Sequence, residues 1–447
     1  MRHYKPLPFC LTMTLPFRKH LSAPGLINTI YKEFVKIPDE ATFSREPSIS
    51  LTDHLMSGLA VFGLKCPSLL DFERQKEETP TENNLRDFYH VNQAPSDTYL
   101  RQRLDGVSPG HLRPAFKKLF SVFQRGKGLE RYEFLDGHVL ISGDGTGQFH
   151  STKISCPSCC QKKSRDGGIS YYHQMFGVCV VHPKQKNVIP LCPEPILKED
   201  GLEKNDCERN ACRRFLKHFR REHPHLKAIF LADGLSSNAP NIEMLKENHL
   251  RFILIAKPGD HRYLFEQLEE SEQTVYYEMH TDDGCYHQFR FLNRAFLNKS
   301  CENLKVNVLE YRCTHKKGKE VNFSWVTDIK LKESNVLQIS QAGRARWKIE
   351  NETFNTLKNL GYNFEHSYGH GKQHLSTIFC LLMMLAFLVD QIQEACCTVF
   401  QACKQRKGTY RRLWEAVRAL FLEVVIGSWE NLYCLILKKK RLIMDTS

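Results

Sequence analysis

The segment AIFLADG, residues 228–234, places an acidic residue directly behind a short apolar run. Such a run, bounded by a turn signal, predicts a buried β-strand that spans Ala228 to Ala232. Asp233 then lies at the end of this strand. Asp-Gly alone indicates only a turn, and the pair recurs elsewhere, for example at Asp105 and Asp283. A functional role for Asp233 therefore requires a second strand end and a third acid.

The segment VLISGDG, residues 139–145, has the same form, and Asp144 ends it. If the two strands are neighbours in one sheet, both carboxylates emerge close together as hard oxygen ligands. A glycine follows each aspartate and leaves room for a ligand. Glu350 is the third acid, on a predicted helix where Arg346 and Phe354 share its face. The plain alternative is two turn aspartates and a surface Arg346–Glu350 pair.

The chain has 447 residues, enough for two or three domains. Helical patterns fill residues 1–135, with a polar loop expected over 74–84. Three successive strands follow, and then helices alternate with strands, which predicts a mixed sheet covered by helices. Residues 271–330 contain four more strands and predict a β-rich insertion. We expect the sheet domain to comprise 136–270 and 331–395, the second part carrying the Glu350 helix, and 396–447 to form a helical C-terminal region.

Composition gives an ordinary globular protein, with 41% hydrophobic and 25% charged residues. A net charge of +13 favours a polyanionic partner, nucleic acid before membrane. The 17 cysteines are mostly scattered and no secretory signal is evident, which indicates a reduced, cytosolic protein. The apolar run 375–389 is shorter than the ~20 residues that span a bilayer, so we expect a buried helix.

Two short helices around NQAPS, residues 92–96, have the form of a helix-turn-helix. Ser96 is a suitable N-cap for the second helix. Arg101 and Arg103 lie on or beside the predicted exposed face of that helix and are candidate DNA contacts. A plain helical hairpin accounts for the same pattern.

The segment CPSCC, residues 156–160, contains a Cys-x2-Cys spacing typical of zinc sites. Cys156, Cys159 and Cys160 are therefore candidate ligands for a structural Zn²⁺, which His150, His173 or His182 could complete. The alternative is free thiols in a loop.

Six segments, including LISGDGTGQFHS, IFLADGLSSNAP and RARWKIENETFNTLKNLGYNFEHSYGHG, resemble bacterial insertion-sequence transposases of the DDE type. The resemblance covers roughly residues 50–395. It implies an RNase H-like catalytic domain with helical N- and C-terminal regions, and cut-and-paste DNA transposition. Two Mg²⁺ ions, for which Mn²⁺ can substitute, are held by two aspartates and one glutamate, here Asp144, Asp233 and Glu350. Such metals activate the attacking oxygen and stabilise the leaving one.

The resemblance also implies partners and a location. The partners are transposon terminal inverted repeats and target DNA, bound by a homodimer in the synaptic complex, with no membrane. The location is the bacterial cytoplasm, at the nucleoid. Residues 1–135 would bind DNA.

The 117 residues from Asp233 to Glu350 match the branch of this family that carries a β-rich insertion. That branch has a Tyr-x2-Arg-x3-Glu-x6-Lys signature, which Arg346 and Glu350 fit. Gly343 stands at the Tyr position, and Lys358 lies one residue beyond the Lys position. Arg346 and Lys358 are thus candidate phosphate contacts. Trp325, from the insertion, is the candidate for stacking on a flipped base, with a core position as its alternative.

Two other functions remain open. The chain could be a catalytically inactive or domesticated DNA-binding protein, or a simple metal-dependent nuclease or phosphatase. The three acids favour an active enzyme over the first, and the basic N-terminal region favours a transposase over the second.

Overall fold

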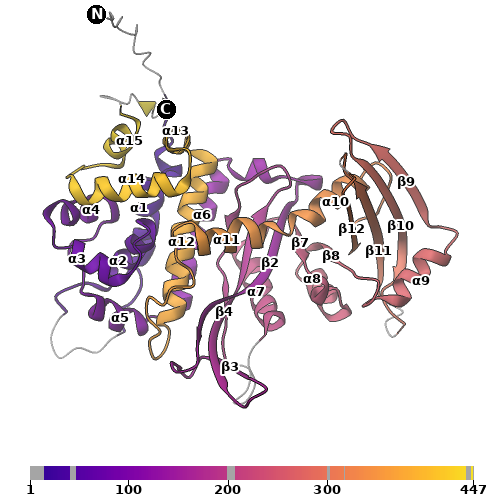
Figure 1. Cartoon of the computed structure of the whole chain (residues 1–447), viewed down its shortest axis with the longest axis horizontal. Helices are drawn as coiled ribbons and strands as arrows, with labels where there is room; N and C mark the ends of the chain where they lie inside the picture. Colours follow the sequence, from indigo (N-terminus) through magenta and orange to yellow (C-terminus); the bar gives the residue numbers. More distant parts are fainter. Residues whose placement is uncertain are drawn as a thin grey trace, which may run out of the picture. The chain divides into compact units, whose positions relative to one another are not determined.

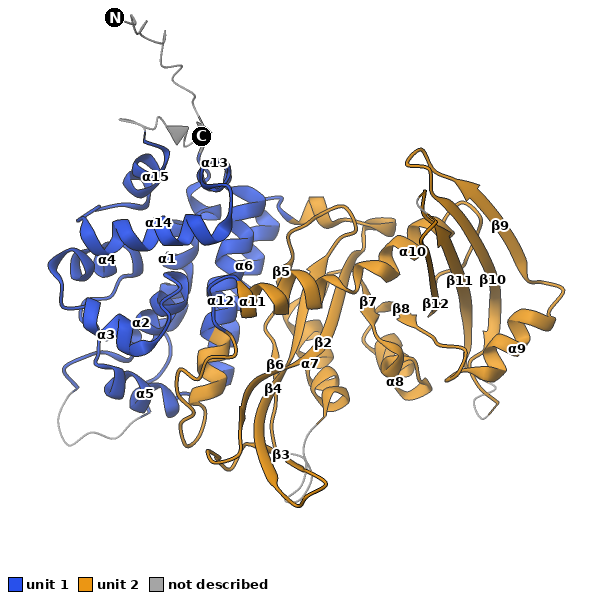
Figure 2. Cartoon of the chain, in the orientation of Figure 1, with its two compact units in different colours: residues 1–128, 360–363, 382–447 blue, residues 129–359, 364–381 orange. Residues whose placement is uncertain are grey.

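The structure is a computed structural model that describes residues 15–40, 47–198, 207–299, 303–316, 318–438 and 444–445. The chain divides into two compact units (Figure 2). Unit 1 comprises residues 1–128, 360–363 and 382–447. Unit 2 comprises residues 129–359 and 364–381.

Unit 1 is helical (Figure 1). Its described helices are α1 (Ala23–Phe34), α2 (Leu51–Gly63), α3 (Leu69–Gln75), α4 (Thr79–Tyr89), α5 (Asp97–Asp105), α6 (Arg113–Arg125), α13 (Thr398–Lys407), α14 (Tyr410–Glu423) and α15 (Trp429–Leu437). The loop expected over 74–84 is wrong. Only three residues separate α3 from α4, because Pro80 occupies the first turn of α4, where its fixed φ suits a helix start.

The N-terminal and C-terminal helical regions belong to the same unit. Asn84 of α4 donates from Nδ2 to the carbonyl oxygens of Phe421 (2.8 Å) and Val424 (2.7 Å). Its Oδ1 accepts from the backbone N–H of Ile426 (3.0 Å). A buried amide with these three bonds closes the end of α14. The two regions, which the sequence pattern separates, therefore fold together.

Unit 2 is built on a sheet of eleven strands, with parallel and antiparallel neighbours, flanked by helices. Its main path runs β3-β4-β2-β7-β8-β12-β11-β10-β9. The strands are β2 (Val139–Ser151), β3 (Cys160–Lys163), β4 (Ile169–Val181), β5 (Ile189–Pro190), β6 (Glu194–Ile196), β7 (Ala228–Ala232), β8 (Arg251–Ile255), β9 (Val275–His280), β10 (Tyr286–Phe296), β11 (Lys305–Thr314) and β12 (Glu320–Thr327). This confirms the expected mixed sheet, the strand at 228–232 and the four strands within 271–330.

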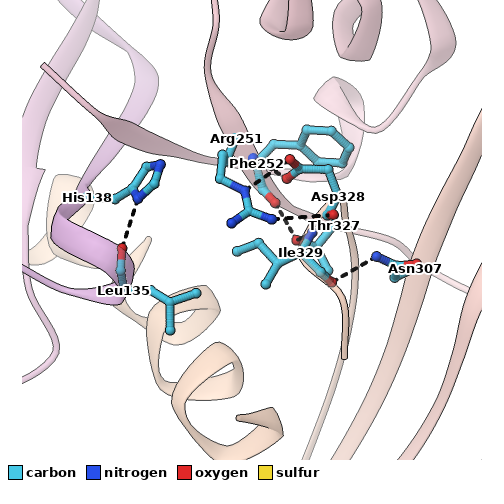
Figure 3. Close-up of polar contacts among 8 residues, drawn as sticks. All are labelled: Leu135, His138, Arg251, Phe252, Asn307, Thr327, Asp328 and Ile329. Carbon is cyan, nitrogen blue, oxygen red and sulfur yellow. Dashed lines mark hydrogen bonds and ion pairs between the residues drawn. The ribbon is translucent and has the colours of Figure 1, made fainter. Parts of the chain in front are cut away.

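The insertion strands join the same sheet through β12, which pairs antiparallel with β8. Side chains secure this junction (Figure 3). Asp328 accepts from Arg251 Nε and from the Phe252 backbone N–H, each at 3.1 Å. Thr327 donates from Oγ1 to the Phe252 carbonyl (2.6 Å), and Asn307 donates from Nδ2 to the Ile329 carbonyl (2.8 Å). The insertion is thus an extension of the central sheet.

The helices of unit 2 are α7 (Glu208–Glu222), α8 (Ala239–Glu247), α9 (Arg262–Glu270), α10 (Val336–Ala345) and α11 (Asn355–Asn359). Between α10 and α11 lies η6 (Ile349–Phe354), which is a π-helix. The single long helix expected around Glu350 is therefore interrupted. Ala211, Phe215 and Phe219 of α7 are buried as their spacing predicts.

Helix α12 (Leu375–Cys396) has 22 residues and is apolar enough to cross a membrane by length and composition. However, 94% of its most apolar window is buried inside the protein. The expected buried helix is confirmed, although it extends beyond residue 389.

Candidate functional site

Asp144 and Asp233 lie at one edge of the pairing between β2 and β7. These strands are parallel, and their last paired residues are Ser142 and Leu231. Continuing this register by two residues along each chain segment places Asp144 opposite Asp233. Neighbouring strands in a sheet lie about 4.8 Å apart. Asp233 directly follows β7, as predicted. Asp144 does not end its strand, because β2 continues in antiparallel pairing with β4 as far as Ser151.

Glu350 reaches the same region from the π-helix η6. Arg346 donates from Nη1 to Asp144 Oδ2 (3.3 Å) and from Nη2 to Glu350 Oε1 (2.9 Å). Ser142, two residues before Asp144, donates from Oγ to the Arg346 carbonyl (3.0 Å). One turn of π-helix inside a helical segment is frequent at functional sites. The structure thus joins Asp144 and Glu350, which are distant in sequence.

The surroundings of Asp144 disfavour its charge. Burial raises the pKa of Asp144 to about 6, and the neighbouring carboxylates Glu208 and Glu350 act in the same direction. Arg346 and the backbone N–H of Gly145, which donates to Oδ1 at 2.9 Å, oppose the shift. A perturbed carboxyl beside other acids is typical of a site that binds a cation or moves a proton.

Glu208, the first residue of α7, is a fourth acid that the sequence pattern did not single out. A Cβ on Gly145 would lie 2.1 Å from Glu208 Oε1, so the carboxylate occupies space that only glycine leaves free. Desolvation, and then the charge of Asp233, raise the pKa of Glu208. The signal available in the sequence was Gly145 itself, since any side chain at this position would block the approach.

Successive residues of β2 face opposite sides of the sheet. Gly145 approaches α7, whereas Asp144 faces Arg346 and its strand partner Gly177, which packs under Phe354 of η6. Helix α7 and η6 therefore cover opposite faces, and the acids converge where the β2–β7 pairing ends.

A second cluster lies further along β2 and β4. Cys156, Cys159, His173 and His370 each offer a ligand atom, and these atoms lie within 4.8 Å of one another, so the cluster could hold a metal such as zinc. Cys160 is outside it, because adjacent residues entering a strand face opposite sides. Its Sγ lies 3.7 Å from the Ile196 carbonyl. His150 and His182 are also outside the cluster. A smaller group joins Cys285, Cys313 and His315.

Trp325 is 1% exposed and lies in the core, so it is not available to stack on a base. A Cβ on Gly343 would lie 2.4 Å from the indole, so the buried Trp325 requires a glycine at this position. The side chain of Arg346 is 8% exposed and faces the acids, so it is not a free phosphate contact. Lys358 is one-third exposed and pairs with Glu365 at 2.8 Å, whereas Leu357 is buried.

In unit 1, Ser96 caps α5 by accepting from the Tyr99 N–H at 3.3 Å, as predicted. Arg101 is partly exposed and pairs with Asp97 at 2.8 Å. Arg103 is buried and pairs with Asp39, so the expectation that it lies at the exposed face is wrong. Its position on α5 adjoins Leu104 on the inward side, which draws it into the core.

A groove lies on the insertion. Its lining includes the basic residues Lys257, Arg290 and Arg312, aromatic residues such as Tyr276, Phe323 and Trp347, and the acids Glu278 and Glu310. Arg290 pairs with Glu310 at 2.6 Å. Trp347 and Tyr276 are 47% and 66% exposed. The guanidinium of Arg346 lies 5.6 Å from the Trp347 ring centre. Lys257 Cε lies 4.0 Å from the Cβ position of Gly234, the neighbour of Asp233. Trp347 and Lys257 thus line the groove and also lie near residues of the acidic site.

Searches of protein-family models and of curated proteins return no match to this chain.

Proposed function

We propose that the chain is a metal-dependent DNA transposase of the DDE type, with unit 2 as an RNase H-like catalytic domain. One observation carries the proposal. Asp144 and Asp233 lie on neighbouring chain segments where the parallel pairing of β2 and β7 ends, and a single arginine links Asp144 to Glu350 on an interrupted helix. Three acids separated by 89 and 117 residues in sequence have no need to meet for folding alone.

The donor set suits Mg²⁺ or Mn²⁺. Carboxylate oxygens are the ligands that hard divalent cations prefer, and Mg²⁺ retains waters when few carboxylates bind it. Asp144, Asp233 and Glu350 are the residues that would hold the ion. Arg346 now neutralises part of their charge, so it would have to release one carboxylate when a cation binds. When bound, two such ions support in-line displacement at phosphorus.

The protein's own residues have distinct tasks in this proposal. Arg346 holds Glu350 toward Asp144 in the absence of metal. The Gly145 N–H fixes the orientation of Asp144 by its bond to Oδ1. Glu208 lies close enough to Asp233 for the charge of Asp233 to raise its pKa, and it is a positioning acid or an additional ligand.

The adjacent groove supports a polynucleotide as the substrate. Exposed aromatic rings stack on bases without regard to sequence, and basic side chains follow the phosphates. Trp347 and Tyr276 provide such exposed rings, and Lys257 lines the same groove and lies near Gly234, the neighbour of Asp233. The net charge of +13 agrees with a nucleic-acid partner.

The test uses the purified chain, Mg²⁺ or Mn²⁺, and duplex DNA ending in the inverted repeats that flank the gene. Asp144→Asn, Asp233→Asn and Glu350→Gln should each reduce strand cleavage by more than ~100-fold, since even outer-shell partners of metal ligands contribute 10–100-fold. DNA binding should persist or tighten, because a negative charge near phosphate is removed.

Asp283→Asn is the matched control. Asp283 also precedes a glycine, but it lies in the turn between β9 and β10, where it bonds to Thr281. Its cleavage rate should equal that of the wild type. Wild-type cleavage by any one of the three active-site variants would remove that residue from the site, and cleavage by all three would end the proposal.

A further inference from the structure

The second cluster in unit 2 draws ligands from three segments of the chain. Cys156 and Cys159 lie between β2 and β3, His173 lies on β4, and His370 lies in the segment that precedes α12. Cys159 and His173 are 0% and 2% exposed. A free thiol is readily buried by itself, but a buried imidazole needs a hydrogen-bond or metal partner, and here two imidazoles converge on two thiols.

The distances between the ligand atoms match a tetrahedral metal site. Cys156 Sγ and Cys159 Sγ are 3.7 Å apart. Sulfur-to-Nε2 distances are 3.4 Å for Cys156–His173, 3.3 Å for Cys159–His173 and 3.4 Å for Cys159–His370. A tetrahedron with Zn–S of about 2.3 Å and Zn–N of about 2.0–2.1 Å places sulfurs about 3.8 Å apart and sulfur and nitrogen about 3.6 Å apart.

A disulfide does not account for the cluster. It requires sulfurs about 2.05 Å apart, and both cysteines are free. On each histidine Nε2 faces the sulfurs, whereas Nδ1 has no hydrogen-bond partner. Nε2 is therefore the ligand atom of both rings. The ring of His370 also packs against Phe149 in a tilted arrangement, with ring centres 4.3 Å apart, which restrains its orientation.

We propose that unit 2 binds one structural Zn²⁺ ion through four side chains: Cys156, Cys159, His173 and His370. Two sulfur and two nitrogen ligands in a tetrahedron select zinc over Mg²⁺ or Ca²⁺. Four protein ligands leave no open position, which distinguishes a structural site from a catalytic one.

The ion would fasten the segment before α12 to the β2–β4 hairpin. His173 pairs in register with Phe149, five residues beyond Asp144 on β2, or about 16 Å along the strand. Zinc would thus stiffen the strand that carries Asp144 without touching the acids. The inference does not depend on the proposed function, since it rests on a separate set of residues.

The test measures metal content in the full-length chain, purified under reducing conditions without chelator. We expect about one zinc per chain by elemental analysis, and little iron. Replacement of zinc by Co²⁺ should give the absorption bands of tetrahedral cobalt bound to thiolate. Cys159→Ser and His370→Ala should each lose most of the metal.

Two control variants sharpen the test. Cys160→Ser changes the neighbouring buried thiol, and Cys285→Ser changes the smaller three-residue group; both should retain zinc. Asp144→Asn should also retain it, so a failure of DNA cleavage and a failure of zinc binding are separate results. If Cys159→Ser does not fold, the zinc content of His370→Gln is compared with that of the wild type instead. Wild-type protein without zinc that also gives no tetrahedral cobalt spectrum would overturn the proposal, as would full zinc content in His370→Gln.

Discussion

Two regions of the molecule place basic and acidic side chains together inside the protein, with opposite results. In unit 1, Lys65 Nζ lies 2.6 Å from Asp390 Oδ2, and the side chains are 2% and 8% exposed. The Tyr362 hydroxyl also donates to Asp390. The Lys65 ammonium lies 4.1 Å from the ring centre of Trp414. Here one cation pairs with one anion, and Tyr362 and Trp414 provide their further contacts within unit 1.

In unit 2 the charges do not balance. Arg346 faces Asp144 and Glu350, while Glu208 and Asp233 lie close by, and Lys257 approaches only the edge near Gly234. Among the residues that the structure describes, these four carboxylates thus have one buried guanidinium and one peripheral ammonium near them. A surplus of partly buried anions is unfavourable unless a cation arrives. The Lys65–Asp390 pair is thus neutral by itself, whereas the acids around Asp144 carry more negative charge than the nearby cations neutralise.

The largest effect on stability is expected at the balanced pair. Asp390→Ala would leave the Lys65 ammonium buried without its partner, and breaking such a pair costs about 3–5 kcal/mol. The double variant Lys65→Met/Asp390→Leu removes both charges and should recover most of that loss. Chemical denaturation followed by circular dichroism measures both. Equal losses in the single and double variants would mean that packing, and not charge, dominates at this position.

Two tryptophans of unit 2 also differ in their surroundings, because Trp325 is buried and Trp347 is exposed. Trp325→Ala should lower the free energy of unfolding by about 3–5 kcal/mol, because it removes a fully buried indole. Trp347→Ala should change stability little. It should instead weaken binding of single-stranded DNA by about 1–3 kcal/mol, the contribution of one stacked base.

Fluorescence anisotropy with a labelled oligonucleotide measures the affinity, and thermal denaturation measures the stability. Phe323, which stacks on Trp325 with ring centres 5.6 Å apart, lies between the two environments. Undiminished DNA affinity in Trp347→Ala would assign the groove to another ligand.

The sequence predicts the main elements of both units because their apolar patterns are local. The stripe of α2, the strand that ends before Asp233 and the insertion strands all follow from alternation or helical spacing. Where the structure differs from the prediction, the position of a residue depends on a partner far along the chain. Asp144 does not end β2, because β4 continues to pair with it; Arg103 is inward because Asp39 receives it.

The candidate sites show the same division. Asp144, Asp233 and Glu350 could be named from the sequence, through strand ends and a family resemblance. Glu208 and His370 were not singled out, because neither follows an apolar strand or belongs to a Cys-x2-Cys spacing, and only the folded chain brings them to Gly145 and Cys159. The sequence left the burial of Trp325 open, and the structure shows that it is buried whereas Trp347 is exposed.

The smallest effect concerns the pH dependence of the unbalanced site. An aspartate in an unfolded chain has a pKa near 3.9, whereas burial raises the pKa of Asp144 to about 6. Between these values the unfolded chain has released the proton that the folded chain retains. The stability of the metal-free protein should therefore fall as pH rises from about 4 to about 6, and stay lower above that range.

Asp144→Asn removes this titration. Two pKa units correspond to roughly 3 kcal/mol as an upper limit, and loss of the contact with Arg346 offsets part of it. We therefore expect Asp144→Asn to be about 1–3 kcal/mol more stable than the wild type at pH 7.5 without metal, and equally stable near pH 4. Mg²⁺ should stabilise the wild type and leave the variant unchanged. Thermal denaturation from pH 4 to 8, with and without Mg²⁺, measures the stability at both pH values and the effect of the ion. If the variant is less stable than the wild type at pH 7.5, the ion pair with Arg346 outweighs the cost of burying the Asp144 carboxylate. The site would then be balanced like the Lys65–Asp390 pair of unit 1.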